Sequence, residues 1–294
     1  MKNKETNETK IIVLGGLGEV GKNMYCVMHK DAIVIIDAGV SFPESELMGV
    51  DYVLPNFTFL KENEDKIKAL LITHGHEDHI GGIPFLLQSI NIPAIYAPNH
   101  AKELISVKLQ DRNIRYDNLF VYTDQTKLKF KEIEVEFFRI THSIPDSHGI
   151  SIKTPDGRLV FTGDYKFDLT PIGPMADLYK MTSLGEEGVD ILLGDSTNAL
   201  NEGFSNSESV VDETVEKAYR ELLKETDQEK KKVMEITISA LKEQSSKTMS
   251  ISKSCKTTIL SLIEEKSFFS LQIFKNSFDF SIIFLKVDEL VLLI

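Results

Sequence analysis

A short segment rich in histidine and acidic residues carries the clearest chemical information in the sequence. It reads THGHEDH (residues 73–79) and directly follows an apolar run at 69–72. Imidazole nitrogens and carboxylate oxygens are the ligands that zinc and manganese take at hydrolytic sites. Gly75 allows a tight turn, so the first two histidines can face one ion while the aspartate and the last histidine reach a second. The candidate ligands are His74, His76, Asp78 and His79. The alternative is a solvated polar loop with incidental histidines, which we disfavour for so dense a pattern.

Two further candidate ligands stand directly after predicted strands. His142 follows the apolar run at 135–140, and Asp164 follows the run at 159–161. Considered alone, such a histidine is more often a surface or core residue and such an aspartate more often a turn residue. Beside THGHEDH, the histidine can complete the first metal site and the aspartate can bridge both ions. Two ions would lower the pKa of a bridging water so that hydroxide is available near pH 7, and no protein nucleophile is then required.

A glycine-rich segment near the start allows two interpretations. GGLGEVGKN (residues 15–23) matches the dinucleotide-binding pattern G-x-G-x-x-G, and Asp37 stands where a ribose-binding acid could lie. It also approaches a P-loop, but Asn23 occupies the position of the serine or threonine that would hold magnesium. Residues 24–29 alternate like a strand, and the stretch before the next strand is too short for a crossover helix. The sequence therefore favours a tight turn between two strands beside the metal site.

The remaining pattern predicts an α/β protein with mixed strands and with ligand-bearing loops at strand ends. Predicted strands cover residues 11–14, 33–36, 69–72, 135–140, 159–161 and 191–193. Predicted helices cover residues 80–89, 100–110 and 208–224. Pro155-Asp156-Gly157 between two β-rich runs predicts a hairpin turn.

Composition limits the class of protein. The 294 residues are 42% hydrophobic and 27% charged, a balance typical of a soluble globular protein. No apolar run is long enough for a signal peptide or a membrane span, and two distant cysteines make no disulfide framework, so we expect a cytoplasmic protein without a membrane partner. The net charge of −12 is unusual for a nucleic-acid-binding protein. If RNA is the substrate, the local positive field must come from metal ions and a few lysines.

The composition changes in the last third of the chain. All 17 glycines lie at or before Gly203 and all nine prolines at or before Pro174. Beyond about residue 230 neither turn residues nor a consistent hydrophobic period can be found. The sequence predicts a break near residues 225–235, and our hypothesis is that the reading frame is lost there.

Four segments together resemble one family. GGLGEVGKN (15–23), ITHGHEDHIGG (72–82), FTGDYKFDLTP (161–171) and GDSTNAL (194–200) are similar to bacterial ribonuclease J, of the β-CASP branch of the metallo-β-lactamase superfamily. The resemblance extends over residues 10–224. It implies an αββα four-layer sandwich, incomplete in this chain, and two divalent metal ions. Zn²⁺ is the expected metal, and Mn²⁺ is the alternative.

The resemblance also assigns roles to residues. The first ion would be bound by His74, His76 and His142, the second by Asp78 and His79, with Asp164 bridging them. Asp78 and Asp195 would be catalytic, Asp195 holding a proton or orienting a ligand, although an aspartate at position 195 could equally cap a turn. The implied reaction is hydrolysis of RNA phosphodiesters, 5′-to-3′ exonucleolytic and endonucleolytic, in RNA decay and ribosomal RNA maturation. A homodimer and partners in RNA decay are further implications.

The chain departs from the family after about residue 224, shortly beyond the expected end of its first domain at residue 205. We expect residues 1–205 to form the N-terminal part of the metallo-β-lactamase domain, and residues 206–294 to begin a β-CASP domain and continue as an aberrant tail. Ser205 and Ser207 stand at that boundary, where they could also cap the helix predicted at 208–224. The family's last ligand histidine has no counterpart, because no histidine follows His148. Two alternatives therefore stay open: an inactive metal-binding fragment, and a separate hydrolase of small esters or thioesters.

Overall fold

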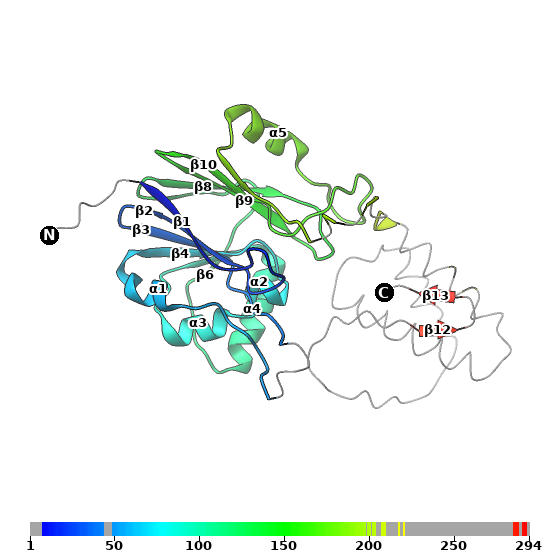
Figure 1. Ribbon diagram of the computed structural model, residues 1–294, viewed down its shortest axis with the longest axis horizontal. Coiled ribbons are helices and arrows are strands. Elements are labelled where there is room, and N and C mark those ends of the chain that lie inside the picture. Colours follow the sequence, from blue (N-terminus) through cyan, green and yellow to red (C-terminus); the bar gives the residue numbers. More distant parts are fainter. Residues whose placement is uncertain are drawn as a thin grey trace. The chain divides into compact units, whose positions relative to one another are not determined.

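The computed structural model describes residues 8–43, 49–197, 199–200, 202–203, 207–209, 217, 220, 285–287 and 290–292 (Figure 1). The chain divides into two compact units, Met1–Glu208 and Ser209–Ile294. In the second unit, strands β12 (Leu285–Val287) and β13 (Leu290–Leu292) form an antiparallel pair. The composition break predicted at 225–235 and most of the helix predicted at 208–224 lie outside the described residues, so the proposed domain boundary stays a prediction.

A six-stranded sheet forms the first half of the first unit. Its strands, in spatial order, are β1 (Thr9–Gly15), β2 (Met24–His29), β3 (Ala32–Ile36), β4 (Ile67–Leu71), β5 (Ile95–Ala97) and β6 (Leu119–Val121). The first three strands pair antiparallel, and the pairs from β3 to β6 are parallel. Parallel neighbours need crossover connections. The helices in these connections are α1 (Thr58–Glu62), α2 (Glu77–Ile80), α3 (Ile83–Ser89) and α4 (Asn99–Asp111), and a 3₁₀ turn (Glu64–Lys66) precedes β4.

A five-stranded sheet forms the second half of this unit. Its order is β11-β10-β9-β8-β7, and only the β10–β11 pair is parallel, joined through helix α5 (Leu178–Glu187). The strands are β7 (Lys127–Phe130), β8 (Ile133–Arg139), β9 (His148–Thr154), β10 (Gly157–Phe161) and β11 (Ile191–Leu193). The predicted hairpin turn at 155–157 is confirmed, since Thr154 pairs with Gly157 across it.

The two sheets pack face to face between two layers of helices (Figure 1). Side chains from the inner faces of both sheets, such as Val34, Leu71, Phe137 and Ile152, form the central core. A second core lies between the first sheet and helices α1, α3 and α4, and a smaller one between the second sheet and α5. The expected αββα arrangement is therefore confirmed. Among the described helices, none has the length and apolar character of a membrane span.

The glycine-rich segment connects β1 to β2 as a loop between adjacent antiparallel strands. A dinucleotide-binding unit would instead have two parallel strands joined by a helix. The interpretation as a turn beside the candidate site is thus the correct one. Three of its glycines have positive φ, which suits residues without a side chain: Gly16, Gly18 and Gly21.

The helix predicted at 80–89 is interrupted. The structure has the short helix α2 and then α3, with Gly81 and Gly82 between them. A side chain at Gly82 would lie 2.8 Å from the carbonyl oxygens of Ala38 and Gly39. The close approach of this backbone to the end of β3 explains the break, which a hydrophobic period alone does not reveal.

Candidate metal centre

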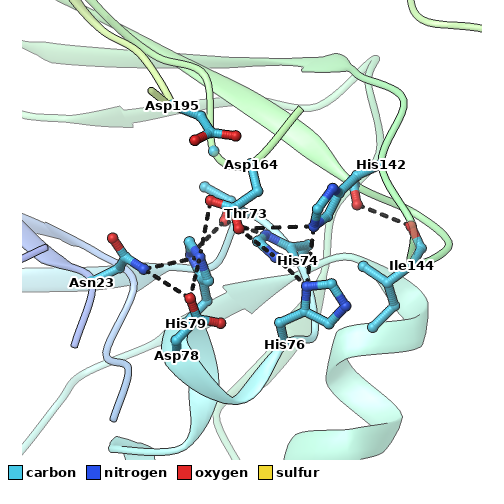
Figure 2. Close-up of polar contacts among 12 residues, drawn as sticks. Asn23, Thr73, His74, His76, Asp78, His79, His142, Ile144, Asp164 and Asp195 are labelled. Atoms are coloured by element: carbon cyan, nitrogen blue, oxygen red, sulfur yellow. Dashed lines mark hydrogen bonds and ion pairs between the residues drawn. The ribbon is translucent and has the colours of Figure 1, made fainter. Parts of the chain in front are cut away.

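The predicted ligands meet at one end of the sandwich, in loops that follow strands of both sheets (Figure 2). The first sheet contributes the loop after β4 and helix α2, which carry the THGHEDH residues. The second sheet contributes the loops after β8, β10 and β11, which carry His142, Asp164 and Asp195 respectively. Loops from two sheets thus converge on a common point, as expected for a site at the ends of strands.

Three histidines and one aspartate form the first cluster, in which all ligand atoms lie within 4.8 Å of one another. His76 Nδ1 is 3.0 Å from His74 Nε2 and 3.1 Å from His142 Nε2. Oδ2 of Asp164 lies 3.9 Å from His74 Nε2 and 3.8 Å from His142 Nε2. Three ring nitrogens and one carboxylate oxygen directed at one point match a four-coordinate zinc site.

Asp164 also belongs to the second cluster, together with Asp78 and His79. Its Oδ1 atom lies 3.2 Å from His79 Nε2, and Asp78 Oδ2 lies 3.5 Å from the same nitrogen. One carboxylate therefore faces each cluster with a different oxygen. The structure brings all six predicted ligands together in the two predicted groups, with Asp164 shared between them.

A buried aspartate beneath the clusters orients the rings. Asp37, at the end of β3, accepts hydrogen bonds from the backbone nitrogen of Thr73 (2.8 Å) and from its hydroxyl (2.8 Å). Its Oδ2 atom also lies 2.7 Å from His79 Nδ1. Since this carboxylate can only accept, His79 carries a proton on Nδ1 and directs Nε2 into the cluster.

The hydroxyl of Thr73 fixes the next histidine in the same way. Its proton goes to Asp37, so its oxygen accepts from His74 Nδ1 at 3.0 Å. This arrangement leaves the lone pair of His74 Nε2 directed into the first cluster. The backbone of Thr73 is part of the support as well, because its carbonyl oxygen accepts from His148 N on the second sheet at 3.0 Å.

Burial keeps the imidazoles of the first cluster in the form that binds metals. It lowers the pKa of His74 well below the ordinary value, and the neighbouring histidines add to the shift. Burial likewise lowers the pKa of His142 to about 4, with His76 contributing. Burial also lowers the pKa of His76, against the attraction of Asp78. Neutral imidazole is the ligand form of histidine, so these groups need not lose a proton at pH 7.

The second cluster has the opposite electrostatic balance in the chain without metal. Burial by itself would lower the pKa of His79, but the carboxylates of Asp37 and Asp164 outweigh it and raise this pKa well above the ordinary value. Burial raises the pKa of Asp164, and the hydrogen bond to His79 with the other imidazoles lowers it by more. The carboxylates of Asp37 and Asp164 therefore stabilise a protonated, positively charged His79 in the metal-free chain. A bound cation would supply a positive charge at the same place.

Close backbone contacts place helix α2 against the end of β3. The nitrogen of Ala38 donates to the carbonyl of His79 (2.8 Å), and an added Cβ at Gly39 would lie 1.5 Å from the carbonyl oxygen of Asp78. Only glycine fits at this point. On the other side of the loop, Glu77 forms an ion pair with Lys108 of helix α4. These contacts hold the THGHEDH segment from two directions.

Asp195 lies near the clusters but belongs to neither (Figure 2). Its backbone nitrogen donates to Thr162 Oγ1 at 3.0 Å. Its Oδ1 atom accepts from the nitrogen of Thr197 at 2.9 Å and from the hydroxyl of Thr197 at 2.6 Å. The turn-capping interpretation of Asp195 is thus correct, and its carboxylate also acts electrostatically on His142 of the first cluster. Ser207 exchanges hydrogen bonds with Thr170, whereas Ser205 lies outside the described residues.

Three residues at this site were not predicted from the sequence as part of it: Asp37, Thr73 and Asn23. The side-chain nitrogen of Asn23 lies 3.2 Å from Asp78 Oδ2 and 3.1 Å from His79 Nε2. In the sequence, Asp37 directly follows an apolar run and suggests a ribose-binding acid. A buried carboxylate needs a hydrogen-bonding or charged partner, and this requirement could have indicated the contact of Asp37 with a histidine.

The donor set fits divalent cations. The first cluster offers three neutral imidazoles and one carboxylate, and the second offers one imidazole and two carboxylates. Such sets are suited to zinc and, where oxygen dominates, to manganese. Their orienting contacts with Asp37 and Thr73 are also of the kind that metal ligands have.

Comparisons with known proteins agree with this geometry. A model of the metallo-beta-lactamase superfamily matches residues 17–202. Ribonuclease J 1 of Streptococcus pyogenes serotype M3 is 52% identical over 210 residues, which cover 71% of this chain and 37% of that protein. Ribonuclease J of Mycoplasma pneumoniae is 42% identical over 214 residues, covering 72% of this chain and 38% of that protein. The matched region thus spans well under half the length of these relatives.

A solved structure supports the same fold at low sequence identity. A protein of unknown function from Enterococcus faecalis aligns with a TM-score of 0.54 and 14% identity, covering 70% of this chain and 56% of that chain. The match of the family model covers most of the first unit, including the loops that carry both clusters. The fold of this family implies binding of divalent metal ions. The chain belongs to the metallo-β-lactamase superfamily.

Proposed function

We propose that the chain is the metal-binding part of a ribonuclease that hydrolyses RNA phosphodiesters with two divalent cations. The observation that carries the proposal is the convergence of six ligands in two clusters that share one carboxylate. Two adjacent cations suit the displacement reactions of phosphate esters, in which negative charge develops on several oxygens at once. The similarity to two proteins named ribonuclease J supports RNA as the substrate.

The first cation would be held by His74, His76, His142 and Asp164, and the second by Asp78, His79 and Asp164. When bound, such cations supply Lewis-acid chemistry: they lower the pKa of a water molecule and offset the charge that develops on phosphate oxygens. The nitrogen-rich first cluster favours Zn²⁺, and the oxygen-rich second cluster also suits Mn²⁺.

The chain itself supplies orientation and proton handling. Asp37 and Thr73 accept from or donate around the Nδ1 atoms of two histidines, so the Nε2 atoms of both rings already point into the clusters before a cation binds. Asp195 has one carboxylate oxygen held by Thr197, and its charge acts on His142 of the first cluster. We infer that the side chain of Asp195 orients a ligand or passes a proton to the leaving oxygen of the RNA, as a general acid does.

The whole ribonuclease would combine 5′-to-3′ exonucleolytic and endonucleolytic cleavage, act in the cytoplasm in RNA decay and ribosomal RNA maturation, and form homodimers. These properties are implied by the resemblance of the sequence segments, and the names of the relatives support only an action on RNA; this chain matches 37–38% of the length of those relatives. Residues 206–294 would begin the second domain of such an enzyme. With a net charge of −12, the chain must rely on its cations for much of its attraction to phosphate.

A second candidate function is metal binding without cleavage. The second cluster contains three candidate ligands against four in the first, and one of the three is shared. A cation with fewer protein ligands binds more weakly, and the loss of an activating ion would lower the rate of hydrolysis steeply. This candidate predicts a folded chain with one tightly bound ion and no ribonuclease activity.

A cleavage assay with matched variants tests the proposal. The purified full chain is incubated with a 3′-labelled, 5′-monophosphorylated RNA and Mn²⁺ or Zn²⁺, beside His142→Ala and the control His100→Ala. His100 lies on helix α4 outside both clusters. We expect cleavage by the chain and the control and a loss of at least about a hundredfold in His142→Ala. A folded chain that binds two ions but leaves RNA intact would refute the ribonuclease function.

A further inference from the structure

The side-chain amide of Asn23 contacts two members of the second cluster, Asp78 and His79 (Figure 2). Its terminal nitrogen lies 3.2 Å from Asp78 Oδ2 and 3.1 Å from His79 Nε2. In the first cluster, neighbouring ligand nitrogens are 3.0 and 3.1 Å apart. The amide of Asn23 is therefore as close to two ligand atoms of the second cluster as the ligand atoms of the first cluster are to each other.

Backbone hydrogen bonds fix Asn23, at the end of the glycine-rich loop, beside the second cluster. The backbone nitrogen of Asn23 donates to the carbonyl of Asp78, and its carbonyl accepts from Gly39 N, both at 3.0 Å. These bonds tie Asn23 between the end of β3 and the start of helix α2. They place the amide of Asn23 beside the carboxylate of Asp78 and the ring of His79.

Two glycines make room for this arrangement. A Cβ at Gly15 would lie 2.3 Å from the carbonyl oxygen of Lys22, and one at Gly16 would lie 2.3 Å from Asn23 Oδ1. Gly16 also has a φ of +87°, which other residues rarely adopt. The resemblance of the segment to a nucleotide-binding loop thus has a different structural cause: these glycines allow Asn23 to approach the metal cluster.

The orientation of the Asn23 amide depends on whether a cation is bound between Asp78 and His79. Without a cation, the NH₂ group of Asn23 donates to Asp78 Oδ2, which can only accept, and lies beside His79 Nε2. A cation between these ligands repels N–H and attracts a carbonyl oxygen. The two ends of an amide have nearly the same size, so a half-turn of the group presents the oxygen without displacing its neighbours.

We propose that Asn23 is the fourth protein ligand of the second cation, through its side-chain oxygen. This inference rests on the two-cation function proposed above and adds a residue to it. A neutral amide oxygen beside two carboxylates makes this cluster oxygen-rich, which favours Mn²⁺ over Zn²⁺ relative to the first cluster. The second cluster then has four protein ligands, like the first.

Metal binding tests the role without reference to catalysis. Free Mn²⁺ is followed by electron paramagnetic resonance during titration of the metal-free full chain, of Asn23→Leu and of Asn23→Asp. The control is Asn118→Leu, whose side-chain nitrogen donates to the carbonyl of Pro93 and which belongs to neither cluster. Thermal unfolding in chelator shows whether each variant is folded.

We expect two Mn²⁺ ions per chain, with the weaker dissociation constant raised about tenfold or more in Asn23→Leu and unchanged in the control. Asn23→Asp should lower it, because an anionic oxygen replaces a neutral one. Equal second-site affinity of Asn23→Leu and the unaltered chain would overturn the role of Asn23, as would weaker binding by Asn23→Asp. If the unaltered chain binds fewer than two ions, both this role and the two-cation function are wrong.

Discussion

Replacement of Asp37 with asparagine removes the acceptor on which two histidine orientations depend. Asp37 is 3% exposed and its two oxygens accept three hydrogen bonds, from Thr73 N, Thr73 Oγ1 and His79 Nδ1. The oxygen that asparagine retains can continue to accept from the backbone nitrogen of Thr73. Its NH₂ group then faces the hydroxyl and the ring, which were both donors.

The expected destabilisation follows from these contacts. A hydrogen bond to a charged group contributes about 1.5–3 kcal/mol, and removal of one partner from a buried charged pair costs about 3–5 kcal/mol. The threonine hydroxyl can turn to accept, which recovers part of this loss. We therefore expect Asp37→Asn to lower the free energy of unfolding of the metal-free chain by roughly 3 kcal/mol.

The same substitution should weaken the second cation site. Facing an NH₂ group, His79 must accept on Nδ1 and move its proton to Nε2, the atom that faces Asp164. That atom then cannot bind a cation. We expect two bound Mn²⁺ ions in the unaltered chain and one in the variant.

Urea unfolding in chelator measures the stability, and Mn²⁺ titration measures the stoichiometry. The control is Asp31→Asn in the exposed ion pair with Lys131, which should change neither quantity. The account of Asp37 would be refuted if Asp37→Asn lowered the free energy of unfolding by less than about 1 kcal/mol and still bound two ions at the original affinity. Removal of a buried acceptor of three hydrogen bonds should destabilise the chain by more than that.

Three further predictions concern the fold, the pH dependence and the metal. Gly39→Ala should destabilise the chain by at least about 3 kcal/mol, because its Cβ would meet the backbone oxygen of Asp78; Gly185→Ala, with no atom near its Cβ, should be neutral or stabilising in the same thermal unfolding experiment. Hydrogen bonds from Thr9 lower the pKa of Asp156, so this carboxylate stabilises the fold above pH of about 4 and the contribution is lost as the pH falls below that value. Urea midpoints of Asp156→Asn between pH 3 and 6 should accordingly depend less on pH than those of the unaltered chain, and an identical dependence would contradict the contact. Addition of a divalent cation at about one hundred times its dissociation constant should raise the free energy of unfolding by about 2.7 kcal/mol, and an unchanged melting temperature would argue against a site formed only in the folded state.

The sequence was most informative where ligands are dense. THGHEDH, with His142 and Asp164 at strand ends, predicted a site whose six residues do lie together in two groups. The reason is physical, because charged and imidazole groups directly after buried strands are costly without a common purpose. Strands β1, β3, β4, β8, β10 and β11 followed from apolar runs, and the αββα arrangement followed from the family resemblance. The roles of the residues as ligands are still predictions that the metal titrations test.

Other features depend on contacts that no local pattern contains. The function of Asp37 is visible only once its contacts with Thr73 and His79 are known, and that of Asn23 only once its loop lies on helix α2. The three-residue strands β5 and β6 are too short to show a hydrophobic period. The break after α2 arises from a close approach of two backbones. For Asp37, for Asn23 and for the break after α2, the determining contact is with residues far away in the sequence.

The sharing of Asp164 between the clusters has a kinetic consequence. The histidines of THGHEDH belong to the first sheet, whereas His142 and Asp164 belong to the second, so neither cluster is complete before the two sheets have docked. Docking of segments far apart in the sequence is slow, and a cation that binds only afterwards cannot accelerate it. Bound cations instead join the sheets at one end and raise the barrier to their separation. Metal should therefore slow the unfolding of this chain and its proteolysis, while the rate of folding stays nearly the same.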